Sequence, residues 1–499
     1  MLSLSKSKYC GLWQCPKIAW LNKYKPEVME VSPALQDRMD TGNVVGDLAM
    51  GLFGDFVEVT SVKEDGRIDI ATMIKRTQDE MAKGTNVICE ASFSYNGLYC
   101  AVDILRKEDN GWSIYEVKSS TSAEKDVYTA DVAYQKYVLE HCGVTLCHVY
   151  LVCINNEYIF DGSLDIHQLF KITDITAPVA LEQRNIEANI FIGERILNNP
   201  NEPDIDIAER CMNPYSCAYW NYCTRHVPTP SVFDLYRMQF KKKLEYYHKG
   251  VVRYEDLILD PDMTNPMRLR QLEFALENKG AYVNKAGIRD FLDTLSFPLY
   301  FLDFETMQLV IPQFVGTRPY EQIPFQYSLH YIEYKGGPLL HKEFLAESGE
   351  DPRRAIAEAL CRDIPRNVCV TAYNKAFECT RLKELAEQFP DLADHLLNIR
   401  DNMKDFLVPF QSGYYYNKAM GGSFSIKSVL PALFPGDPAL DYHNLEGVHN
   451  GGEAMNLFPR IKDLSPAEQA KARHDLLKYC ELDTYAMVKV WEELVRASK

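Results

Sequence analysis

The stretch Tyr300-Phe-Leu-Asp-Phe-Glu-Thr306 decides the fold of the C-terminal part of the chain. It ends an apolar run that begins at Phe297 and is typical of a strand. Side chains two residues apart in a strand point to the same face, so we expect Asp303 and Glu305 to project together. Two neighbouring carboxylates repel each other unless a cation lies between them, and hard oxygen ligands suit Mg²⁺ or Mn²⁺. Taken alone, the pair is still better explained as solvated acids at the end of a strand.

Two later stretches add acidic and phenolic side chains to this pair. Ala372-Tyr-Asn-Lys-Ala-Phe-Glu378 follows a β-branched strand and opens a predicted helix, with Asn374 and Glu378 one turn apart. Near the C-terminus, Tyr479-Cys-Glu-Leu-Asp483 places a phenol and a carboxylate on one helical face. Divalent ions would neutralise acids that converge from such distant positions. The expected site consists of Asp303, Glu305, Glu378, Tyr479 and Asp483.

The order of these residues on strand, loop and helix resembles the DEDD exonuclease superfamily, in the subtype with tyrosine in the last motif. The resemblance implies an RNase H-like fold and the removal of nucleotides from 3′ ends with two metal ions. It implies that Asp303, Glu305 and Asp483 are metal ligands and that Tyr479 orients the attacking water. Glu378 departs from the family, because it stands where aspartate is usual.

Two further residues of this segment are candidates for substrate binding. Lys427 ends the stretch Gly421-Gly-Ser-Phe-Ser-Ile-Lys427, where an ammonium group can hold a phosphate, and Asn374 is the second candidate. The triplet Tyr414–Tyr416 stacks bases in one interpretation and packs as a core loop in the other, and the sequence favours neither. Asp405 is another acid of this segment, for which the sequence offers no role.

A second acidic group is predicted in the N-terminal half. Asp103 and the stretch Tyr115-Glu116-Val-Lys118 lie on successive predicted strands, and Glu116 and Lys118 share a face. An ammonium group beside carboxylates stays protonated, and it can position a water that a metal on Asp103 and Glu116 has acidified. Gln135 lies on the following predicted helix, on the side that faces the sheet. An E-x-K pattern alone often occurs by chance, whereas its combination with the aspartate and the glutamine is more specific.

This second arrangement resembles the PD-(D/E)XK nucleases, particularly their RecB-like group. The resemblance implies a restriction-endonuclease-like domain that cleaves nucleic acid with a divalent metal. Glu90 resembles the extra acid that some members carry ahead of the aspartate. Two positions depart from the family, since Gly46 replaces the histidine of G-x-x-x-H and Leu139 replaces the tyrosine of Q-x-x-x-Y.

Three cysteines recur at equal spacing, with five residues between consecutive members: Cys211, Cys217 and Cys223. Cys15 is the candidate for a fourth partner. The set resembles the iron–sulfur staple of RecB-like nucleases of the AddB and CRISPR-associated groups, which implies a [4Fe–4S] cluster held by four thiolates. Its role would be structural, tying together chain ends that the fold leaves apart. Zinc and buried free thiols are the alternatives, and Cys10 is an alternative fourth ligand.

Length and composition bound the remaining expectations. A chain of 499 residues is too long for one ordinary hydrophobic core, so two or three domains are expected. We expect an α/β protein with a PD-(D/E)XK domain over residues 1–230, a helical connector over 231–295 and an RNase H-like domain over 296–499. No apolar run approaches the ~20 residues of a membrane helix. The stretch 9–21 makes a poor signal peptide, and the cysteines fit a reducing cytoplasm.

The formal net charge of −16 argues against a protein that coats nucleic acid through its overall field, but not against a nuclease with local phosphate contacts. We therefore expect a cytoplasmic, metal-dependent nuclease that acts on DNA ends or single strands in repair or in defence against foreign DNA. The pairing of domains resembles bacterial proteins of uncharacterised function. Two alternatives remain: an RNA 3′ exonuclease whose N-terminal domain loads the substrate, and a nucleic-acid-binding scaffold without catalysis.

Overall fold

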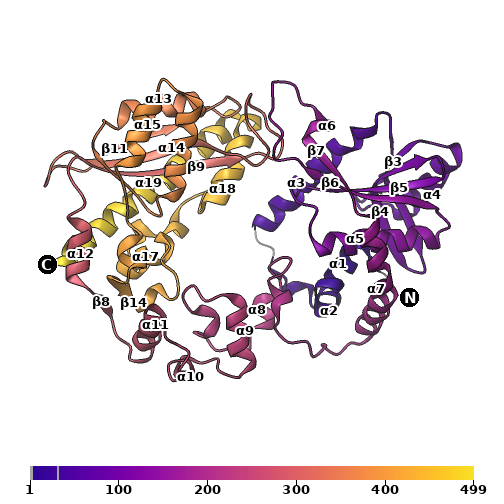
Figure 1. Cartoon of the computed structure of the whole chain (residues 1–499), viewed down its shortest axis with the longest axis horizontal. Helices are drawn as coiled ribbons and strands as arrows, with labels where there is room; N and C mark the ends of the chain where they lie inside the picture. The colour runs from indigo at the N-terminus through magenta and orange to yellow at the C-terminus, as the bar shows by residue number, and fades with distance from the viewer. Residues whose placement is uncertain (1–3, 31–32) are drawn as a thin grey trace. The chain divides into compact units, whose positions relative to one another are not determined.

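The computed structural model describes residues 4–30 and 33–499. The chain is mixed α/β, as the sequence predicts, and it divides into two compact units (Figure 1). Unit 1 contains Met1–His226 and Leu309–Tyr320, and unit 2 contains Val227–Gln308 and Glu321–Lys499. The segment 231–295, which we expected as a connector, is counted with unit 2.

One mixed sheet forms the centre of unit 1. Its strands are β1 (Leu4–Ser5), β2 (Val57–Glu58), β3 (Val87–Tyr95), β4 (Leu98–Glu108), β5 (Gly111–Lys118), β6 (Leu146–Ile154) and β7 (Phe170–Asp174). They are arranged in the order β2-β3-β4-β5-β6-β7, and β1 pairs with β4. Strands β3, β4 and β5 are successively antiparallel, whereas β6 runs parallel to β5 after a helical crossover.

The helices of unit 1 are α1 (Lys6–Gln14), α2 (Pro16–Tyr24), α3 (Pro33–Ala49), α4 (Ile70–Lys83), α5 (Asp126–His141), α6 (Ile166–Leu169), α7 (Thr176–Asn198) and α8 (Trp220–Cys223). The crossover helix is α5, and its side chains Val127, Tyr134 and Val138 are buried in the core against the sheet, as their spacing predicts. Gln135, between them, is therefore also directed inward and is fully buried.

A short segment distant in sequence completes unit 1. The backbone of Phe160 exchanges hydrogen bonds with the 309–320 segment, donating to Thr317 O (3.0 Å) and accepting from Gly316 N (2.7 Å). The hydroxyl of Tyr320 donates to the carbonyl of Ser119. These bonds explain why the residues between two strands of unit 2 belong to unit 1.

A five-stranded sheet forms the centre of unit 2. Its strands are β9 (Leu299–Gln308), β10 (Gln322–Ile332), β11 (Leu340–Leu345), β12 (Cys369–Ala372) and β13 (Met403–Asp405). Their order is β11-β10-β9-β12-β13. Strand β10 is antiparallel to both of its neighbours, whereas β12 is parallel to β9 and to β13. A separate two-stranded ladder pairs β8 (Ala281–Val283) with β14 (Tyr415–Asn417).

The helices of unit 2 are α9 (Phe240–His248), α10 (Tyr254–Leu257), α11 (Pro266–Leu276), α12 (Lys285–Leu292), α13 (Arg353–Asp363), α14 (Ala376–Gln388), α15 (Ala393–Asp401), α16 (Val408–Gln411), α17 (Ile426–Leu433), α18 (Gly451–Leu457) and α19 (Pro466–Ser498). The first part of the expected helical connector, from Ser231 to Gln239, contains a 3₁₀ turn and no α-helix. Ser231 and Asp234 cap each other around one 3₁₀ turn, so α9 begins only at Phe240.

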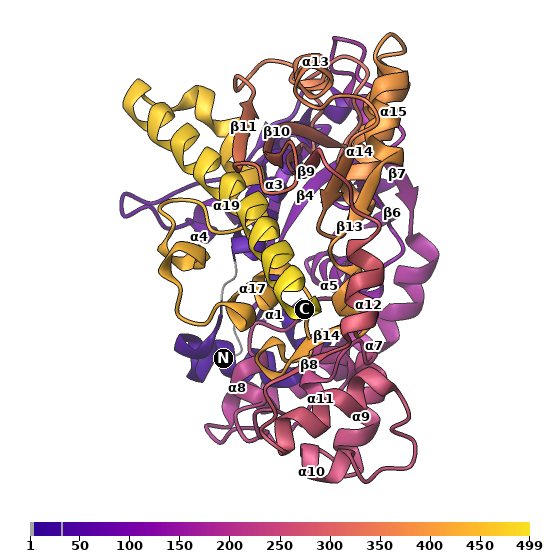
Figure 2. The ribbon, with the colours of Figure 1, turned by 90° about the vertical axis from the view of Figure 1, so that its left-hand side faces the viewer.

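The two faces of the unit 2 sheet differ in chemistry. Leu302 and Phe304 of β9 pack into the apolar core with α13, α14 and α15. The alternate side chains, Asp303 and Glu305, point to the opposite face, along which α19 passes β9 and β10 (Figure 2). A capping box of Ser465 and Glu468 starts α19. Among the described residues, no helix has the length and apolar composition required to cross a bilayer.

Candidate active sites

Four carboxylates from three elements converge in unit 2. Strand β9 supplies Asp303 and Glu305, α14 supplies Glu378, and α19 supplies Asp483. The exposed fractions of Glu305, Glu378 and Asp483 are only 6%, 3% and 8%. Glu378 Oε2 has no hydrogen-bond partner among the described residues. Asp303 is half-buried, so three of the four acids are largely removed from water, and their negative charges repel one another.

The pKa values of all four acids are raised. Burial and the charges of Asp483, Glu305 and Glu378 raise the pKa of Asp303 well above its ordinary value. Burial and Asp483 do the same to the pKa of Glu305. Burial raises the pKa of Glu378 to about 8 and the pKa of Asp483 to about 6. A divalent cation among these oxygens would remove the repulsion, so the donor set fits Mg²⁺ or Mn²⁺.

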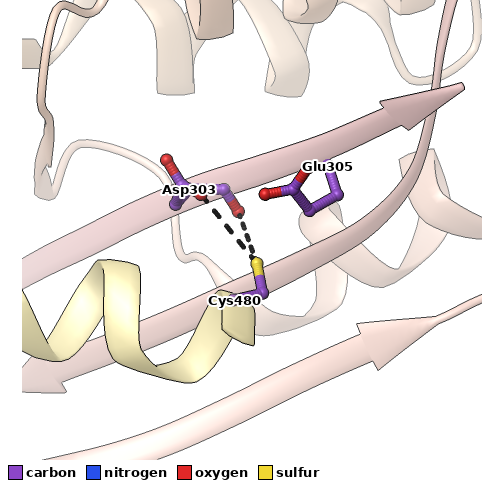
Figure 3. Close-up of side chains that lie close together, drawn as sticks. All are labelled: Asp303, Glu305 and Cys480. Carbon is purple, nitrogen blue, oxygen red and sulfur yellow. Dashed lines mark hydrogen bonds between the residues drawn. The ribbon is translucent and has the colours of Figure 1, made fainter. Parts of the chain in front are cut away.

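Cys480 is a neighbour that the sequence reasoning missed. Its Sγ lies 3.9 Å from Asp303 Oδ2, and one ligand atom each from Asp303, Glu305 and Cys480 lie within 4.8 Å of one another. Figure 3 shows the thiol from α19 directed toward the two carboxylates of β9. The sequence could have indicated Cys480, because it directly follows Tyr479 on the helix that also carries Asp483.

A lysine and two tyrosines border the carboxylates. Lys427 Nζ donates to Tyr479 Oη (3.2 Å) and to the carbonyl of His449 (3.3 Å). Tyr442 Oη donates to Asp483 Oδ1 (2.6 Å), a contact that no sequence pattern indicated. Burial and Asp483 raise the pKa of Tyr479, so its hydroxyl keeps its proton. The structure thus brings the predicted Tyr479 and Lys427 together beside the acids.

The other predicted substrate contact, Asn374, is bonded to Asp405 and, among the described residues, makes no hydrogen bond with the four carboxylates. It precedes α14 with a φ of 66°, its side chain is exposed, and its backbone N–H donates to Asp405 Oδ1 (2.8 Å). The prediction that Asn374 and Glu378 lie one helical turn apart is therefore wrong, since the helix begins at Ala376. Asp405, to which the sequence gave no role, also accepts from Lys375 N (3.2 Å) and thereby fixes the turn that starts α14.

A cavity of about 560 Å³ adjoins this group. It shares Lys427 and Tyr442 with the carboxylate site and extends along Phe434 to His449 and Asn450. The tyrosine triplet does not line it. Tyr415 and Tyr416 are buried, with exposed fractions of 5% and 2%, so the core-loop interpretation holds for these two.

Unit 1 brings its predicted residues together around Glu116. Lys118 Nζ donates to Glu116 Oε1 and to Asp131 Oδ2, both at 2.7 Å. Gln135 Nε2 donates to Glu116 Oε2 (2.8 Å) and to Asp131 Oδ1 (3.0 Å). Asp103 Oδ2 accepts the backbone N–H of Val117 (2.7 Å). Asp131 was missed in the sequence, although it precedes Gln135 by one helical turn and so shares its face.

Lys6 of α1 is a second unpredicted member of this group. Its Nζ donates to Glu116 Oε1 (2.9 Å) and Oε2 (3.2 Å) and to Asp103 Oδ1 (3.4 Å). Burial opposes charge on Lys6, but the carboxylates outweigh it and raise the pKa of Lys6 well above its ordinary value. Lys118 is likewise held with a raised pKa, so both ammonium groups stay charged.

The acids of unit 1 titrate differently from one another. Burial opposes ionisation of Glu116, yet Lys118 and Lys6 outweigh it and lower the pKa of Glu116 to about 2. Burial and the charge of Glu116 raise the pKa of Asp103 to about 6. Glu90, with a φ of 56°, stands between Cys89 and Ala91, which pair with Ile104 and Val102 on either side of Asp103; burial followed by Asp103 raises the pKa of Glu90 to about 7.

The cysteine set of unit 1 lines a single small pocket. Its thiol members are Cys15, Cys211, Cys217 and Cys223. Cys10 is absent from that lining and packs against the apolar core, so it is not the fourth member. Burial raises the pKa of Cys217 to about 11, with further contributions from the other three thiols.

The spacing of these thiols tests which metal they fit. Among the described residues, no three of the four sulfurs lie within 4.8 Å of one another. Four thiolates at ~2.3 Å from one zinc ion would be only about 3.8 Å apart. The four sulfurs would therefore have to move closer together to bind a single zinc ion.

Comparisons with known proteins identify likenesses without naming an activity. A family model described as a domain of unknown function, DUF2779, matches residues 300–425, which include Asp303, Glu305 and Glu378. The uncharacterized protein UU173 of Ureaplasma parvum serovar 3 is 27% identical over 239 residues, covering 43% of this chain. The match spans 33% of that relative, about a third of its length.

Proposed function

We propose that this chain is a metal-dependent nuclease with one acidic site in each unit, which hydrolyses phosphodiester bonds of DNA at ends or in single strands. The observation that carries the proposal is the convergence of Asp303, Glu305, Glu378 and Asp483, three of them buried, from positions up to 180 residues apart in sequence. Such a cluster is costly to a fold that gains nothing from binding cations. Repair or defence against foreign DNA is the biological role that we propose for it.

Strand topology supports an RNase H-like exonuclease domain for unit 2. In chain order its strands are arranged 3-2-1-4-5, with the second antiparallel to the others. Asp303 and Glu305 lie on the first, central strand, and Asp483 and Tyr479 lie on the last helix. This placement of the acids on the central strand and the last helix supports the proposal of a DEDD-type exonuclease domain.

The residues of unit 2 divide the work of hydrolysis. Asp303, Glu305 and Asp483 would hold Mg²⁺ or Mn²⁺, and the bound cations supply an acidified water and stabilise the charge of an in-line displacement. Tyr479 keeps its proton and can orient that water by a hydrogen bond. Lys427 lies beside Tyr479 and opens onto the adjoining cavity, where its charge can hold a phosphate of the substrate.

The fold of unit 1 supports a PD-(D/E)XK domain. The succession α4-β3-β4-β5-α5-β6 places three antiparallel strands before a helical crossover to a parallel strand. Asp103 and Glu116 would hold the cation, and Lys118 would position the water next to it. Gln135 orients Glu116, since it bonds one oxygen of that carboxylate from the buried face of α5.

The four thiols would hold a [4Fe–4S] cluster with a structural role. Cys15 starts α2, whereas the other three lie between residues 211 and 223, so a cluster would join the two ends of unit 1. Anaerobically purified protein should be brown, with a broad thiolate–iron absorption band in the visible range. A colourless protein that holds one zinc ion per chain would contradict the cluster.

Labelled substrates test the proposed activity. We expect 5′-labelled single-stranded DNA to be degraded with Mg²⁺ or Mn²⁺ and to survive in EDTA. Asp303→Asn should abolish the products of unit 2 and Lys118→Met those of unit 1, while Asp401→Asn, a change at an exposed acid of unit 2, serves as the control. Unchanged degradation by both variants and by the double variant would refute catalysis at these sites.

Two outcomes distinguish the alternatives. Faster degradation of RNA than of DNA, abolished by Asp303→Asn alone, would indicate an RNA 3′ exonuclease with unit 1 as a loading module. Metal-independent binding of nucleic acid without any product would indicate a scaffold. Loss of activity in only one single variant would assign binding to the other unit.

A further inference from the structure

The acidic site of unit 1 contains two ammonium groups, and only one of them belongs to the predicted motif. Lys118 belongs to the E-x-K motif, whereas Lys6 comes from the first residue of α1, 97 positions before Asp103. Lys6 Nζ bridges both carboxylates, at 2.9 Å from Glu116 Oε1 and 3.4 Å from Asp103 Oδ1. Lys118 contacts only Glu116 of these two, and its second partner is Asp131.

The acceptor capacity of Glu116 is already filled. Each carboxylate oxygen accepts about two hydrogen bonds. Oε1 accepts from Lys6 and Lys118, and Oε2 accepts from Gln135 (2.8 Å) and Lys6 (3.2 Å). Glu116 can therefore ligate a cation only after one of these donors withdraws.

Lys6 is the donor that can leave at least cost. Lys118 and Gln135 are both also bonded to Asp131, so their withdrawal would break further contacts and leave that buried acid uncompensated. The hydrogen bonds of the Lys6 side chain are with the two expected metal ligands alone, among the described residues. Its withdrawal would free oxygens of Asp103 and Glu116 that face one common point.

The fold holds Lys6 at this point rather than leaving it on a loose terminus. Leu4, two residues earlier, pairs with Leu98 of β4 and is fully buried. Its carbonyl accepts a hydrogen bond from Tyr134 Oη at 2.5 Å, and the ring of Tyr9 stacks on that of Tyr134 with centroids 4.6 Å apart. The backbone at Lys6 is thus fixed against α5 and the sheet, and a withdrawal of the ammonium would be a rotation of its long side chain alone.

We propose that Lys6 is an internal cation that occupies the divalent-metal position of the N-terminal site, so that metal binding must displace its ammonium from Asp103 and Glu116. The inference rests on the proposed function only in that this site binds a divalent ion. It makes Lys6 a positioning residue, which keeps the two ligands together while no metal is bound. Its removal should therefore tighten metal binding, the opposite of what loss of a ligand or of a fold contact would do.

Mn²⁺ titration of the full-length protein, followed by electron paramagnetic resonance, tests this directly. The background carries Asp303→Asn, Glu305→Gln and Asp483→Asn, which remove the three proposed metal ligands of unit 2. Within it, Lys6→Met should lower the Kd for Mn²⁺ at least about tenfold, because a charge-assisted competitor is gone. Lys118→Met removes the same charge without the bridge and should have a clearly smaller effect. Lys8→Met, an exposed lysine of the same helix, should have none.

Each other outcome overturns the proposal in a distinguishable way. An unchanged or raised Kd in Lys6→Met, with Mn²⁺ still bound, would leave the metal site standing and refute the displacement. An equal gain in Lys118→Met would show a general charge effect instead of competition. Absence of any Mn²⁺ binding that Asp103→Asn abolishes would remove the metal site itself, and with it the proposed function of unit 1. Thermal unfolding of each variant shows whether it is folded.

Discussion

Replacing Glu378 by glutamine perturbs the carboxylate cluster of unit 2 with almost no change in shape. The Glu378 side chain is 3% exposed, and burial raises its pKa from 4.5 to about 8. Between these values the folded protein holds the proton that the unfolded chain has released. Because the folded state binds more protons in this window, the free energy of unfolding falls as the pH rises from about 4.5 to about 8.

The pKa difference sets the size of the effect. One pKa unit corresponds to about 1.4 kcal/mol, so ionisation of this one group removes ~3–4 kcal/mol between about pH 5 and about pH 8. Glutamine does not ionise, so Glu378→Gln in EDTA should be spared that loss and be the more stable protein at about pH 8. With Mg²⁺ the order should reverse, because wild-type protein gains more from the bound cation.

Hydrogen exchange measured by mass spectrometry on peptides from β9 and α14 reports the stability of unit 2 separately from unit 1. Glu387→Gln is the control, since it makes the same change at an exposed position of α14. Equal pH dependence of wild type and Glu378→Gln in EDTA would refute the reasoning, because the carboxyl would then be hydrated and not part of a buried cluster.

Three further predictions concern single side chains. Tyr479→Phe should lower kcat of the unit 2 reaction by about 10²-fold while Mn²⁺ affinity stays unchanged; steady-state kinetics beside a metal titration check this, and a parallel loss of affinity would contradict it. Cys15→Ser should remove the visible absorption and speed hydrogen exchange in α1, whereas an unaltered spectrum would exclude Cys15 as a ligand. Asp405→Ala should cost ~2–4 kcal/mol in urea unfolding, because the N–H groups of Asn374 and Lys375 lose their acceptor; a cost under about 0.5 kcal/mol would contradict that role.

Local patterns predicted those parts of the sites that lie within one element. Asp303 and Glu305 share a face because they are two apart in a strand, and Tyr479 and Asp483 because they are four apart in a helix. Gln135 points inward because its helical neighbours are apolar. In each case the neighbouring residues carry the information, so the sequence alone is sufficient.

Contacts between distant segments were beyond such patterns. Lys6 lies 97 residues from Asp103, and Tyr442 lies 41 residues from Asp483 in a region of short turns without periodicity. Asn374 shows the opposite failure: a pattern was present, but its left-handed backbone conformation ends the strand and delays the helix. Side-chain roles that depend on a turn or on chain closure require the three-dimensional structure.

The 309–320 segment is hydrogen-bonded to Phe160 and Ser119 of unit 1, so the two units cannot be separated by cutting the gene at one point. A single break in the gene near codon 230 would yield an N-terminal polypeptide that lacks the 309–320 segment of unit 1. The C-terminal polypeptide would carry that segment directly after the strand that bears Asp303, without the unit 1 residues to which it is hydrogen-bonded. Recombination that exchanges one contiguous stretch cannot swap either half cleanly, so the two halves are expected to be inherited as a pair.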